Sequence, residues 1–352
     1  MKVKSRPEEF KVTEVLSKKP SKKRSKFRYY SLQKRGIETS QALDRVARAS
    51  RVPKEKILYA GIKDKNAQTV QFIAVKEPLK LKELKSRDLT VKFVGWMAEP
   101  PREVIKGNRF EIFVGGVKEL QEERLKTLKE LGIPNYYGEQ RFTPVREGKL
   151  FIEEYLRGAE GAVKYLFTPA GWESSKTRRA KKLFIEGKFS KAAKAFKGWR
   201  RRVAEHLAGG GSWEGALKLI PREEIEFQLN VLQAYLFNEL LSRLIKEGAK
   251  EPLKFKYKLG YLYYPLEEVE LPPELPVFTP EVNLYDEVLK DRGIKREGLK
   301  ELQPLFHSFK RKTLVKPEEL KVKREGEGYT LSFLLPPGAY ATNILRFLFS
   351  AV

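Results

Sequence analysis

The stretch AGIKDKNAQTVQ, residues 60–71, decides how this chain is organised. Its single carboxylate, Asp64, stands between Lys63 and Lys65 and comes shortly after Gly61. The run TVQFIAV that follows is rich in β-branched and aromatic residues. The pattern therefore predicts a strand, a tight charged loop that presents one acid at its mouth, and a second strand.

The residues around Asp64 suit a reactive carboxylate. A glycine before the acid lets the backbone pass close to a ligand, and the two flanking ammonium groups favour the ionised form of the aspartate at neutral pH. An ionised, positioned aspartate can act as a nucleophile toward a sugar or base carbon. The same residues also fit a solvated hairpin loop of mixed charges, because so short a motif is weak when it stands alone.

The loop resembles the signature of the TruD family of tRNA pseudouridine synthases, in which a glycine and any residue precede Lys-Asp, a basic residue and A-x-T-x-Q. Gly61, Lys63, Asp64, Lys65, Ala67, Thr69 and Gln71 match that signature. Four further blocks are similar to family motifs in the family's order and, with the loop, span nearly the whole chain. They are KSRPEEFKVTEV (residues 4–15), NYYGEQRF (135–142), VLQAYLFNELLSR (231–243) and LPPGAYATNILR (335–346).

This resemblance, to an archaeal-type member of the family, implies a fold and a domain plan. The fold class is α+β, with a pseudouridine-synthase-type mixed and largely antiparallel sheet, flanking helices and an inserted, mostly helical α+β domain. The catalytic domain is expected to be discontinuous, formed by residues 1–144 and 311–352. Residues 145–310 are expected to form the TruD-type insertion domain.

The resemblance also implies an activity, the conversion of uridine to pseudouridine in tRNA at position 13 of the D-arm. This isomerisation needs no metal and no cofactor, which suits a chain without a P-loop or a dinucleotide-binding fingerprint. Asp64 is the expected catalytic residue. The expected substrate-binding residues are Lys4, Lys63, Lys65, Asn108, Asn135, Tyr137, Gln140, Arg141 and Phe142.

Two of these residues have more specific expected roles. The resemblance places Lys4 close to the catalytic pocket, where its ammonium group, like that of Lys63, would hold Asp64 ionised. Tyr137 is expected to stack on the target uracil, since RNA bases are held by aromatic stacking and polar contacts to their edges. The alternative for the NYYGEQRF block is a core turn with buried tyrosines. Gln233 and Asn238 also match family positions, and helix packing explains them as well as ligand contact does.

Three positions depart from the family pattern. Tyr137 stands where the family usually has Phe, which keeps an aromatic face and adds a hydroxyl. Thr143 replaces a Gly and removes a flexible position beside the expected site. Phe347 replaces a Glu and removes a charge near the C-terminus.

The composition points to a polyanionic partner. The chain has 71 Lys and Arg against 46 Asp and Glu, a formal net charge of +25. Such an excess of cations favours binding to nucleic acid, although solubility or heat adaptation also enriches surface lysine. Cysteine is absent and the histidines are His206 and His307, so disulfides, thiolate metal sites and a His-based zinc site are not expected.

The remaining expectations concern location and partners. The basic N-terminus lacks a following apolar core and no apolar run is long enough to span a bilayer, so a cytoplasmic protein is expected. The expected partner is tRNA, with no membrane, no protein partner and a monomeric state.

Cations cluster in two segments. Residues 2–35 contain 13 Lys or Arg against three acids, and residues 176–202 contain 12 against one. The first segment is expected to contact phosphates, with a disordered loop as the alternative for residues 19–26. In the second segment, helical spacing predicts that Phe184, Phe189, Phe196 and Trp199 face the core while the cations form an opposite, RNA-facing surface.

Apolar periodicity predicts the main elements. Alternation predicts strands at residues 10–15, 27–32, 89–96 and 108–116. Helical spacing predicts a helix capped by Thr39 or Ser40, one over residues 118–131 that stops at Gly132, and a long one that Pro221 begins and Gly248 ends.

Two other functions fit parts of the pattern. One is a non-catalytic RNA-binding or chaperone protein of the same fold, which would bind RNA without turnover. The other is a nuclease, although nucleases generally use several carboxylates to hold metal ions and no paired-acid motif accompanies Asp64.

Overall fold

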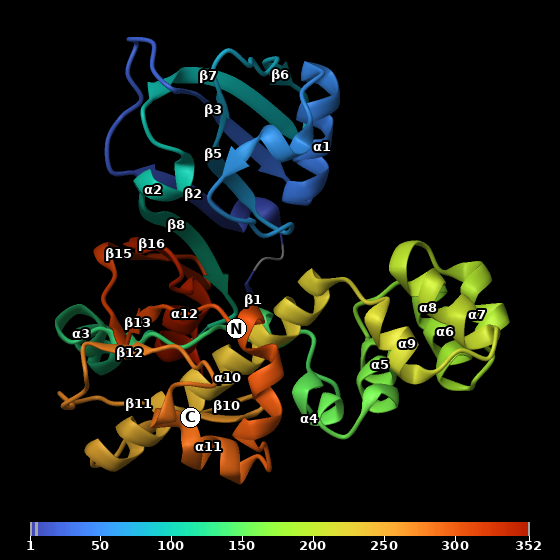
Figure 1. The fold of residues 1–352 in the computed structure, drawn as a ribbon. Helices are drawn as coiled ribbons and strands as arrows, with labels where there is room; N and C mark the ends of the chain where they lie inside the picture. The colour runs from blue at the N-terminus through green and yellow to red at the C-terminus, as the bar shows by residue number, and fades with distance from the viewer. Residues whose placement is uncertain (1, 4–5, 118, 351–352) are drawn as a thin grey trace. The chain divides into compact units, whose positions relative to one another are not determined.

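The computed structural model describes residues 2–3, 6–117 and 119–350, and the chain forms two compact units (Figure 1). The first unit combines the segment that ends at Ile133 with the segment that begins at Val315. The second unit comprises Pro134–Leu314. Segments from both ends of the sequence therefore build one unit, and the middle builds the other.

The division between the units differs from the predicted domain limits of 144/145 and 310/311. It falls at 133/134 and 314/315, so the NYYGEQRF block belongs to the second unit. The physical reason is local packing, since the backbone N–H and C=O of Tyr137 both bond to the Asn238 side chain, at 2.8 and 3.0 Å. The roles assigned to the two domains stay predictions.

Among the described residues, the first unit contains a ten-stranded sheet. Its main order is β15-β16-β8-β2-β5-β3-β7-β6, with β1 paired to β8 and β4 paired to β5. The β2–β5 pair is parallel and the other pairs are antiparallel, which confirms the α+β class and the predicted strands. The strands are β1 (Lys2–Val3), β2 (Phe10–Leu16), β3 (Phe27–Arg35), β4 (Leu58–Tyr59), β5 (Gln68–Lys76), β6 (Leu84–Lys85), β7 (Leu89–Met97), β8 (Ile105–Gly115), β15 (Glu318–Glu325) and β16 (Gly328–Leu335).

Pairing of β16 with β8 joins the two sequence segments of the first unit within this sheet. The register runs from Gly328 opposite Gly115 to Leu335 opposite Asn108. Close to the end of this ladder, a Cβ at Gly107 would collide with the carbonyl oxygen of Leu335, so glycine is required there.

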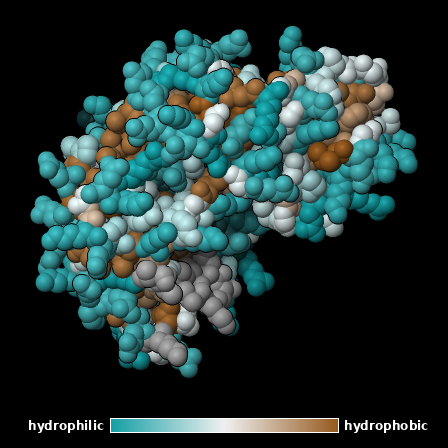
Figure 2. All heavy atoms as spheres, turned by 90° about the horizontal axis from the view of Figure 1, so that it is seen from below, coloured by the Kyte–Doolittle hydropathy of each residue, from teal (hydrophilic) through white to brown (hydrophobic). Residues whose placement is uncertain are grey.

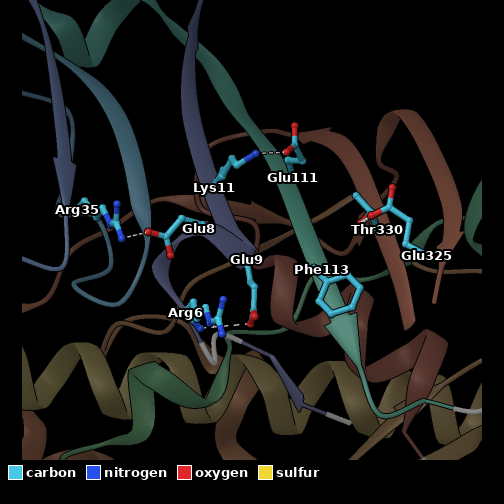
Figure 3. Close-up of a pocket in the computed structure, with 9 residues that line it drawn as sticks. All are labelled: Arg6, Glu8, Glu9, Lys11, Arg35, Glu111, Phe113, Glu325 and Thr330. Atoms are coloured by element: carbon cyan, nitrogen blue, oxygen red, sulfur yellow. Dashed lines mark hydrogen bonds and ion pairs between the residues drawn. The ribbon is translucent and has the colours of Figure 1, made fainter. Parts of the chain in front are cut away.

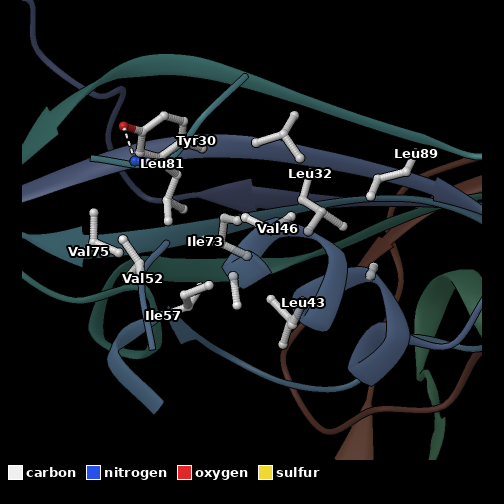
Figure 4. Packing of buried hydrophobic residues seen from close by; sticks show 13 residues of the cluster. Tyr30, Leu32, Leu43, Val46, Val52, Ile57, Ile73, Val75, Leu81 and Leu89 are labelled. Atoms are coloured by element: carbon white, nitrogen blue, oxygen red, sulfur yellow. Dashed lines mark hydrogen bonds between the residues drawn. The ribbon is translucent and has the colours of Figure 1, made fainter. Parts of the chain in front are cut away.

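Helix α1 (Thr39–Ser50) packs on one face of the sheet and buries the apolar stripe that the sequence predicts. Its Leu43 and Val46 meet Leu32 of β3 and Ile73 of β5 in a continuous apolar cluster (Figure 4). Each fully buried side chain of this size contributes about 1.5–3 kcal/mol of transfer free energy. This cluster packs α1 against β3 and β5, and α1 and β3 also bond the backbone of the 60–67 loop.

The N-terminus of α1 differs from the prediction that Thr39 or Ser40 caps it. The N-cap is Glu38, whose backbone N–H donates to Gln41 Oε1 at 3.4 Å. Thr39 is the first helical residue, and its hydroxyl bonds the backbone of Lys63 instead. The hydroxyl expected to cap the helix therefore holds the neighbouring loop.

Other short helices complete the first unit. The helix predicted over residues 118–131 is shorter, because α3 begins at Glu122, where carboxylates in the first turn suit the helix dipole. It ends as predicted before Gly132, which adopts a φ of 82°. The unit also contains η1 (Pro7–Glu9), η2 (Lys54–Lys56), α2 (Pro101–Val104), α3 (Glu122–Glu130) and α12 (Ala341–Phe349).

The second unit is mostly helical. The ring of Phe167 stacks on Phe184 with centroids 3.7 Å apart, and Phe196 and Trp199 meet Phe167 edge-on. The interleaved aromatics therefore face the core, as predicted. The helices are α4 (Phe151–Tyr155), α5 (Ala159–Phe167), α6 (Ser175–Ile185), α7 (Phe189–Ala195), α8 (Gly198–Ala208), α9 (Trp213–Lys218), α10 (Arg222–Gly248) and α11 (Asp286–Asp291).

The long helix α10 organises the rest of this unit. The apolar stripe Leu229, Leu232, Leu236, Phe237 and Leu240 of this predicted helix is buried. Short strands and 3-10 turns accompany it: η3 (Glu139–Phe142), β10 (Leu253–Tyr257), β11 (Gly260–Tyr264), β12 (Glu274–Pro276), η4 (Asn283–Tyr285), η5 (Arg296–Leu305) and β13 (Lys310–Lys312). The chain passes between the units through β9 (Ile133–Pro134) and β14 (Leu314–Val315).

Hydrophilic side chains cover most of the face shown in Figure 2, as expected for a chain in which 33% of residues are charged. Within the described residues, no helix has the length and apolar character that crossing a membrane requires.

Candidate active site

The Asp64 loop has the predicted strand–loop–strand form. β4 and β5 pair antiparallel, with Leu58 opposite Ala74 and Tyr59 opposite Ile73, and the loop over residues 60–67 joins them. A Cβ placed on Gly61 would meet no heavy atom within 4 Å. The protein therefore leaves open space at the glycine that precedes the acid.

Side chains from the neighbouring elements fix the loop backbone. The Thr39 hydroxyl accepts from the Lys63 N–H at 3.0 Å and donates to the Lys63 carbonyl at 3.2 Å. The Gln71 amide donates to the Gly61 carbonyl at 3.3 Å. The carboxylate of Asp64 accepts the N–H of Asn66 at 3.0 Å, which forms an Asx turn. The loop is thus held at three points around its acid.

A buried lysine, Lys34, bonds the backbone of Asp64, and the sequence did not predict this contact. The Lys34 ammonium donates to the backbone carbonyls of Asp64 at 2.6 Å and Ile37 at 3.0 Å, and its side chain is fully buried. Burial lowers the pKa of Lys34 to about 8, against the opposing effect of the Asp64 negative charge. Lys34 therefore anchors the residue that carries the candidate catalytic carboxylate.

The pKa of Lys34 gives a testable pH dependence. Because the folded state holds this pKa below the unfolded value, the unfolded chain binds more protons between about pH 8 and pH 10.5, and stability rises with pH there. We expect wild type to gain about 1–2 kcal/mol between pH 8 and pH 9.5 relative to Lys34→Met. Chemical denaturation of both proteins at the two pH values measures this difference. The same change in unfolding free energy in wild type and Lys34→Met would contradict it.

Each lysine that flanks Asp64 in the sequence lies near another carboxylate in the structure. Lys63 Nζ lies 2.5 Å from the Glu14 carboxylate, so its charge is compensated by that residue. Lys65 is half-exposed and lies 3.8 Å from Glu38. Their binding to substrate stays a prediction. The expected contribution of Lys4 lies outside the described residues.

Glu14 of β2 is the second important residue that the sequence did not reveal. Its side chain is 2% exposed, with one oxygen on Lys63 and the other accepting the Phe72 N–H at 2.7 Å. Burial raises the pKa of Glu14, and the Lys63 charge opposes that effect. The paired ions therefore connect β2, β5 and the Asp64 loop.

The strand register gathers further polar side chains on this face of the sheet. Glu14 lies opposite Asn108 of β8, and Lys34 of β3 lies opposite Thr69 of β5, with Gln71 two residues further along β5 on the same face. Within the described part of the chain, buried oxygens of Thr69, Gln71 and Asn108 have no hydrogen-bond partner. These acceptors, called here the polar cluster, can receive donors from a bound ligand.

A signal for the missed residues does exist in the sequence. Along β2, Phe10, Val12 and Leu16 follow the inward alternation that Glu14 interrupts with an acid. Lys34 interrupts the corresponding series on β3 after Leu32. A charged residue at a core-facing strand position needs a buried partner, but only the register identifies which one.

Figure 3 shows a separate pocket of about 650 Å³ in the first unit. Lys11 and Glu111 face each other across β2 and β8 there and form an ion pair. Because neighbouring strand residues point to opposite faces, this pocket lies on the other face of the sheet from Glu14 and Asn108. It is lined by Arg6, Glu8, Glu9, Lys11, Arg35, Glu111, Phe113, Glu325 and Thr330.

The other predicted binding residues belong to the second unit. Asn135 is buried, its amide donating to the Lys312 carbonyl at 3.1 Å and its side-chain oxygen accepting from Arg311 at 2.9 Å. Phe142 is fully buried and packs edge-on against Tyr257. In this structure both residues support the turn that carries the NYYGEQRF block.

Tyr137 also packs within its own unit. Its side chain is 7% exposed, the Arg311 guanidinium lies 4.1 Å from the ring centroid, and Phe237 meets the ring edge-on. Arg141 approaches the same ring at 5.8 Å, whereas Gln140 is exposed on the η3 turn. Stacking of Tyr137 on uracil stays a prediction.

Two family-matched residues of α10 have packing roles here. The Asn238 side chain bonds the Tyr137 backbone, and the Gln233 amide donates to the carbonyls of Phe278 and His307 at 2.6 and 2.8 Å. The packing alternative therefore accounts for both. No group of three or more His, Asp or Glu that could hold a metal occurs among the described residues.

Comparison with known proteins identifies the family. The model of the tRNA pseudouridine synthase D (TruD) family matches residues 1–254 and 279–348. The tRNA pseudouridine synthase D of Aquifex aeolicus is 30% identical over 397 residues, which cover 99% of this chain and 98% of that protein. A probable tRNA pseudouridine synthase D of Pyrococcus furiosus is 30% identical over 389 residues, covering 98% and 94%.

A solved structure supports the same fold. The crystal structure of the Methanosarcina mazei protein that carries the TruD name superposes with a TM-score of 0.65 and covers 99% of this chain and 93% of that one. At 23% identity this likeness establishes the fold, a pseudouridine-synthase-type α+β architecture. With the family match and the relatives above, it follows that the chain belongs to the TruD family of tRNA pseudouridine synthases.

Proposed function

We propose that this chain converts uridine to pseudouridine in tRNA, at position 13 of the D-arm, with Asp64 as the catalytic carboxylate acting on a flipped-out nucleotide. The observation that carries the proposal is the Asp64 loop. Its sequence matches the family signature, and Thr39, Gln71 and Lys34 hold its backbone in one conformation. Such preorganisation is what a nucleophile needs to meet its target atom.

The reaction is an isomerisation within one nucleoside. The N1–C1′ bond breaks, the base turns, C5 bonds to C1′, the hydrogen of C5 leaves as a proton, and N1 takes up a proton, so the atoms balance. A carboxylate can attack or stabilise the electron-poor carbon that forms when the glycosidic bond breaks. Attack at C6, attack at C1′ and elimination to a glycal all use the same acid.

The polar cluster beside the loop suits such a nucleotide. Asn108, Thr69 and Gln71 each have a buried oxygen that lacks a partner within the described residues. A ribose offers hydroxyl donors and uracil offers its N3–H, so either can satisfy these acceptors. Extracting the base from its stack costs a few kcal/mol, roughly, and contacts of this kind would offset that cost.

The test uses tRNA transcripts that carry tritium at C5 of their uridines. We expect the wild-type protein to release tritium in multiple turnovers without added metal or cofactor. A matched transcript with cytidine at position 13 should release none. Undiminished release from the second transcript would overturn the assigned position. Tight binding without any release would favour the RNA-binding or chaperone function instead.

We further infer a cytoplasmic monomer that acts without a protein partner. An isomerisation transfers no electrons and no external group, so the chemistry itself calls for no carrier. Sedimentation of the free protein and of its tRNA complex measures the oligomeric state, and a dimer in either would contradict the inference.

A further inference from the structure

Trp172 projects into solvent from the turn between α5 and α6. Its side chain is 67% exposed, more than Phe309 (46%), Tyr261 (44%) and Phe227 (43%), which are exposed aromatics of the same unit. Trp199 packs edge-on against Phe167, and Trp213 packs against Phe189. Leaving an indole in water forgoes the free energy of burial, and it keeps the ring accessible to a ligand.

A buried ion pair fixes the turn that carries Trp172. Lys181 Nζ lies 2.8 Å from Glu173 Oε1, and the two side chains are 2% and 7% exposed. The second Glu173 oxygen accepts the Ala170 N–H at 2.9 Å, and Lys181 also donates to the Thr168 carbonyl at 3.3 Å. Burying two ions is costly unless such hydrogen bonds satisfy them. Here they clamp the residues on both sides of the tryptophan.

A second contact holds the other side of the turn. Arg178 donates to the Gly171 carbonyl at 2.9 Å, and the Ser174 hydroxyl caps α6 by accepting the Thr177 N–H at 3.2 Å. The backbone of Trp172 is therefore anchored before and after the residue. A turn held in this way loses little backbone entropy when a ligand stacks on the side chain that it carries.

The helix that follows this indole in the sequence carries exposed cations. Lys176, Arg179 and Lys182 recur at three-residue spacing on α6, and all three are exposed. Within the described residues, no ion pair forms at Lys176 or Arg179. Protein interfaces of standard size need a broad, well-packed contact area, whereas one exposed aromatic followed along the chain by exposed cations suits single-stranded nucleic acid.

We propose that Trp172, Lys176 and Arg179 form a binding site for an unpaired stretch of RNA. A base stacks on the indole, and the adjoining phosphates lie against the two cations. The inference rests on the proposed function only in taking RNA as the substrate class. Base–aromatic stacking of about 1–3 kcal/mol per base corresponds to about 5- to 150-fold in affinity.

The experiment measures binding of a labelled, unmodified tRNA transcript to the full-length protein by fluorescence polarisation. We expect Trp172→Ala to weaken binding at least about fivefold and Trp172→Phe to stay within about twofold of wild type. Phe227→Ala removes a less exposed aromatic of the same unit and is the matched control, with unchanged affinity. The double variant Lys176→Gln, Arg179→Gln should make the slope of log affinity against log salt concentration shallower by about 2, one for each lost phosphate contact. Trp172→Ala should leave that slope unchanged.

Two results would overturn this site. One is an affinity of Trp172→Ala equal to that of the Phe227→Ala control. The other is an equal loss on a fully paired RNA duplex, which offers no unstacked base. Failure of the proposed function gives a different result. If wild type releases no tritium while Trp172→Ala still binds tRNA more weakly than wild type, the binding site stands and the catalytic proposal falls.

Discussion

Replacing Asp64 with Asn is expected to lower the single-turnover rate of pseudouridine formation by on the order of 1,000-fold or more, because an amide cannot supply the anionic oxygen that the reaction uses. The loop should keep its conformation. The Asn side-chain oxygen can still accept the Asn66 N–H that Asp64 accepts at 3.0 Å, and Lys34 bonds the backbone carbonyl, which the substitution leaves in place. RNA affinity is therefore expected to stay within about twofold of wild type.

The matched control is Asp44→Asn on α1 of the same unit. Asp44 is half-exposed and pairs with Lys54 at 2.7 Å, and surface pairs of this kind contribute about 0–1 kcal/mol. Its rate should equal that of wild type. Retention of more than a tenth of the wild-type rate in Asp64→Asn would show that Asp64 does not act as the catalytic carboxylate.

The largest effect on stability is expected at the Glu14–Lys63 pair. Lys63→Met leaves the Glu14 carboxylate buried without its cation, and breaking a buried pair costs about 3–5 kcal/mol. Because burial already raises the pKa of Glu14, the folded variant binds more protons than the unfolded chain above the ordinary glutamate pKa. Its stability should therefore fall as pH rises from 5 to 7 and recover when the pH is lowered.

Amide exchange at Phe72, whose N–H bonds Glu14, reports this effect within the first unit. The double variant with Glu14→Gln should recover most of the loss, since no buried charge is left uncompensated. Lys106→Met is the control, because the Lys106–Glu318 pair is half-exposed at both ends and its loss should change stability by about 1 kcal/mol at most. Equal effects of Lys63→Met and Lys106→Met would contradict a structural role for the buried pair.

Local pattern was enough to predict much of the fold. The alternation in β2, β3 and β7 and the helical spacing in α1 and α10 each reflect a single face that must be buried, and such faces are visible in a short window of sequence. The αL stop at Gly132 follows from glycine's conformational freedom. The predicted cap of α1 was wrong, because the Thr39 hydroxyl bonds the backbone of Lys63 in the Asp64 loop instead.

The candidate site was only half predictable, for a physical reason. Asp64 was identified because its neighbours in sequence carry the signature. Lys34 and Glu14 reach the loop through strand pairings between segments far apart in the chain, and register is not a local property. The surroundings of Tyr137 depend in the same way on Arg311, which comes from the far end of the second unit.

Chemical mapping of pseudouridine in unmodified tRNA transcripts, treated side by side with wild type and Asp64→Ala at protein concentrations that saturate binding, tests the central claim most directly. We expect a single new pseudouridine at position 13 with wild type and none with the variant. Pseudouridine at the same position and extent with both proteins would contradict the account, because the isomerisation would then proceed without the Asp64 carboxylate.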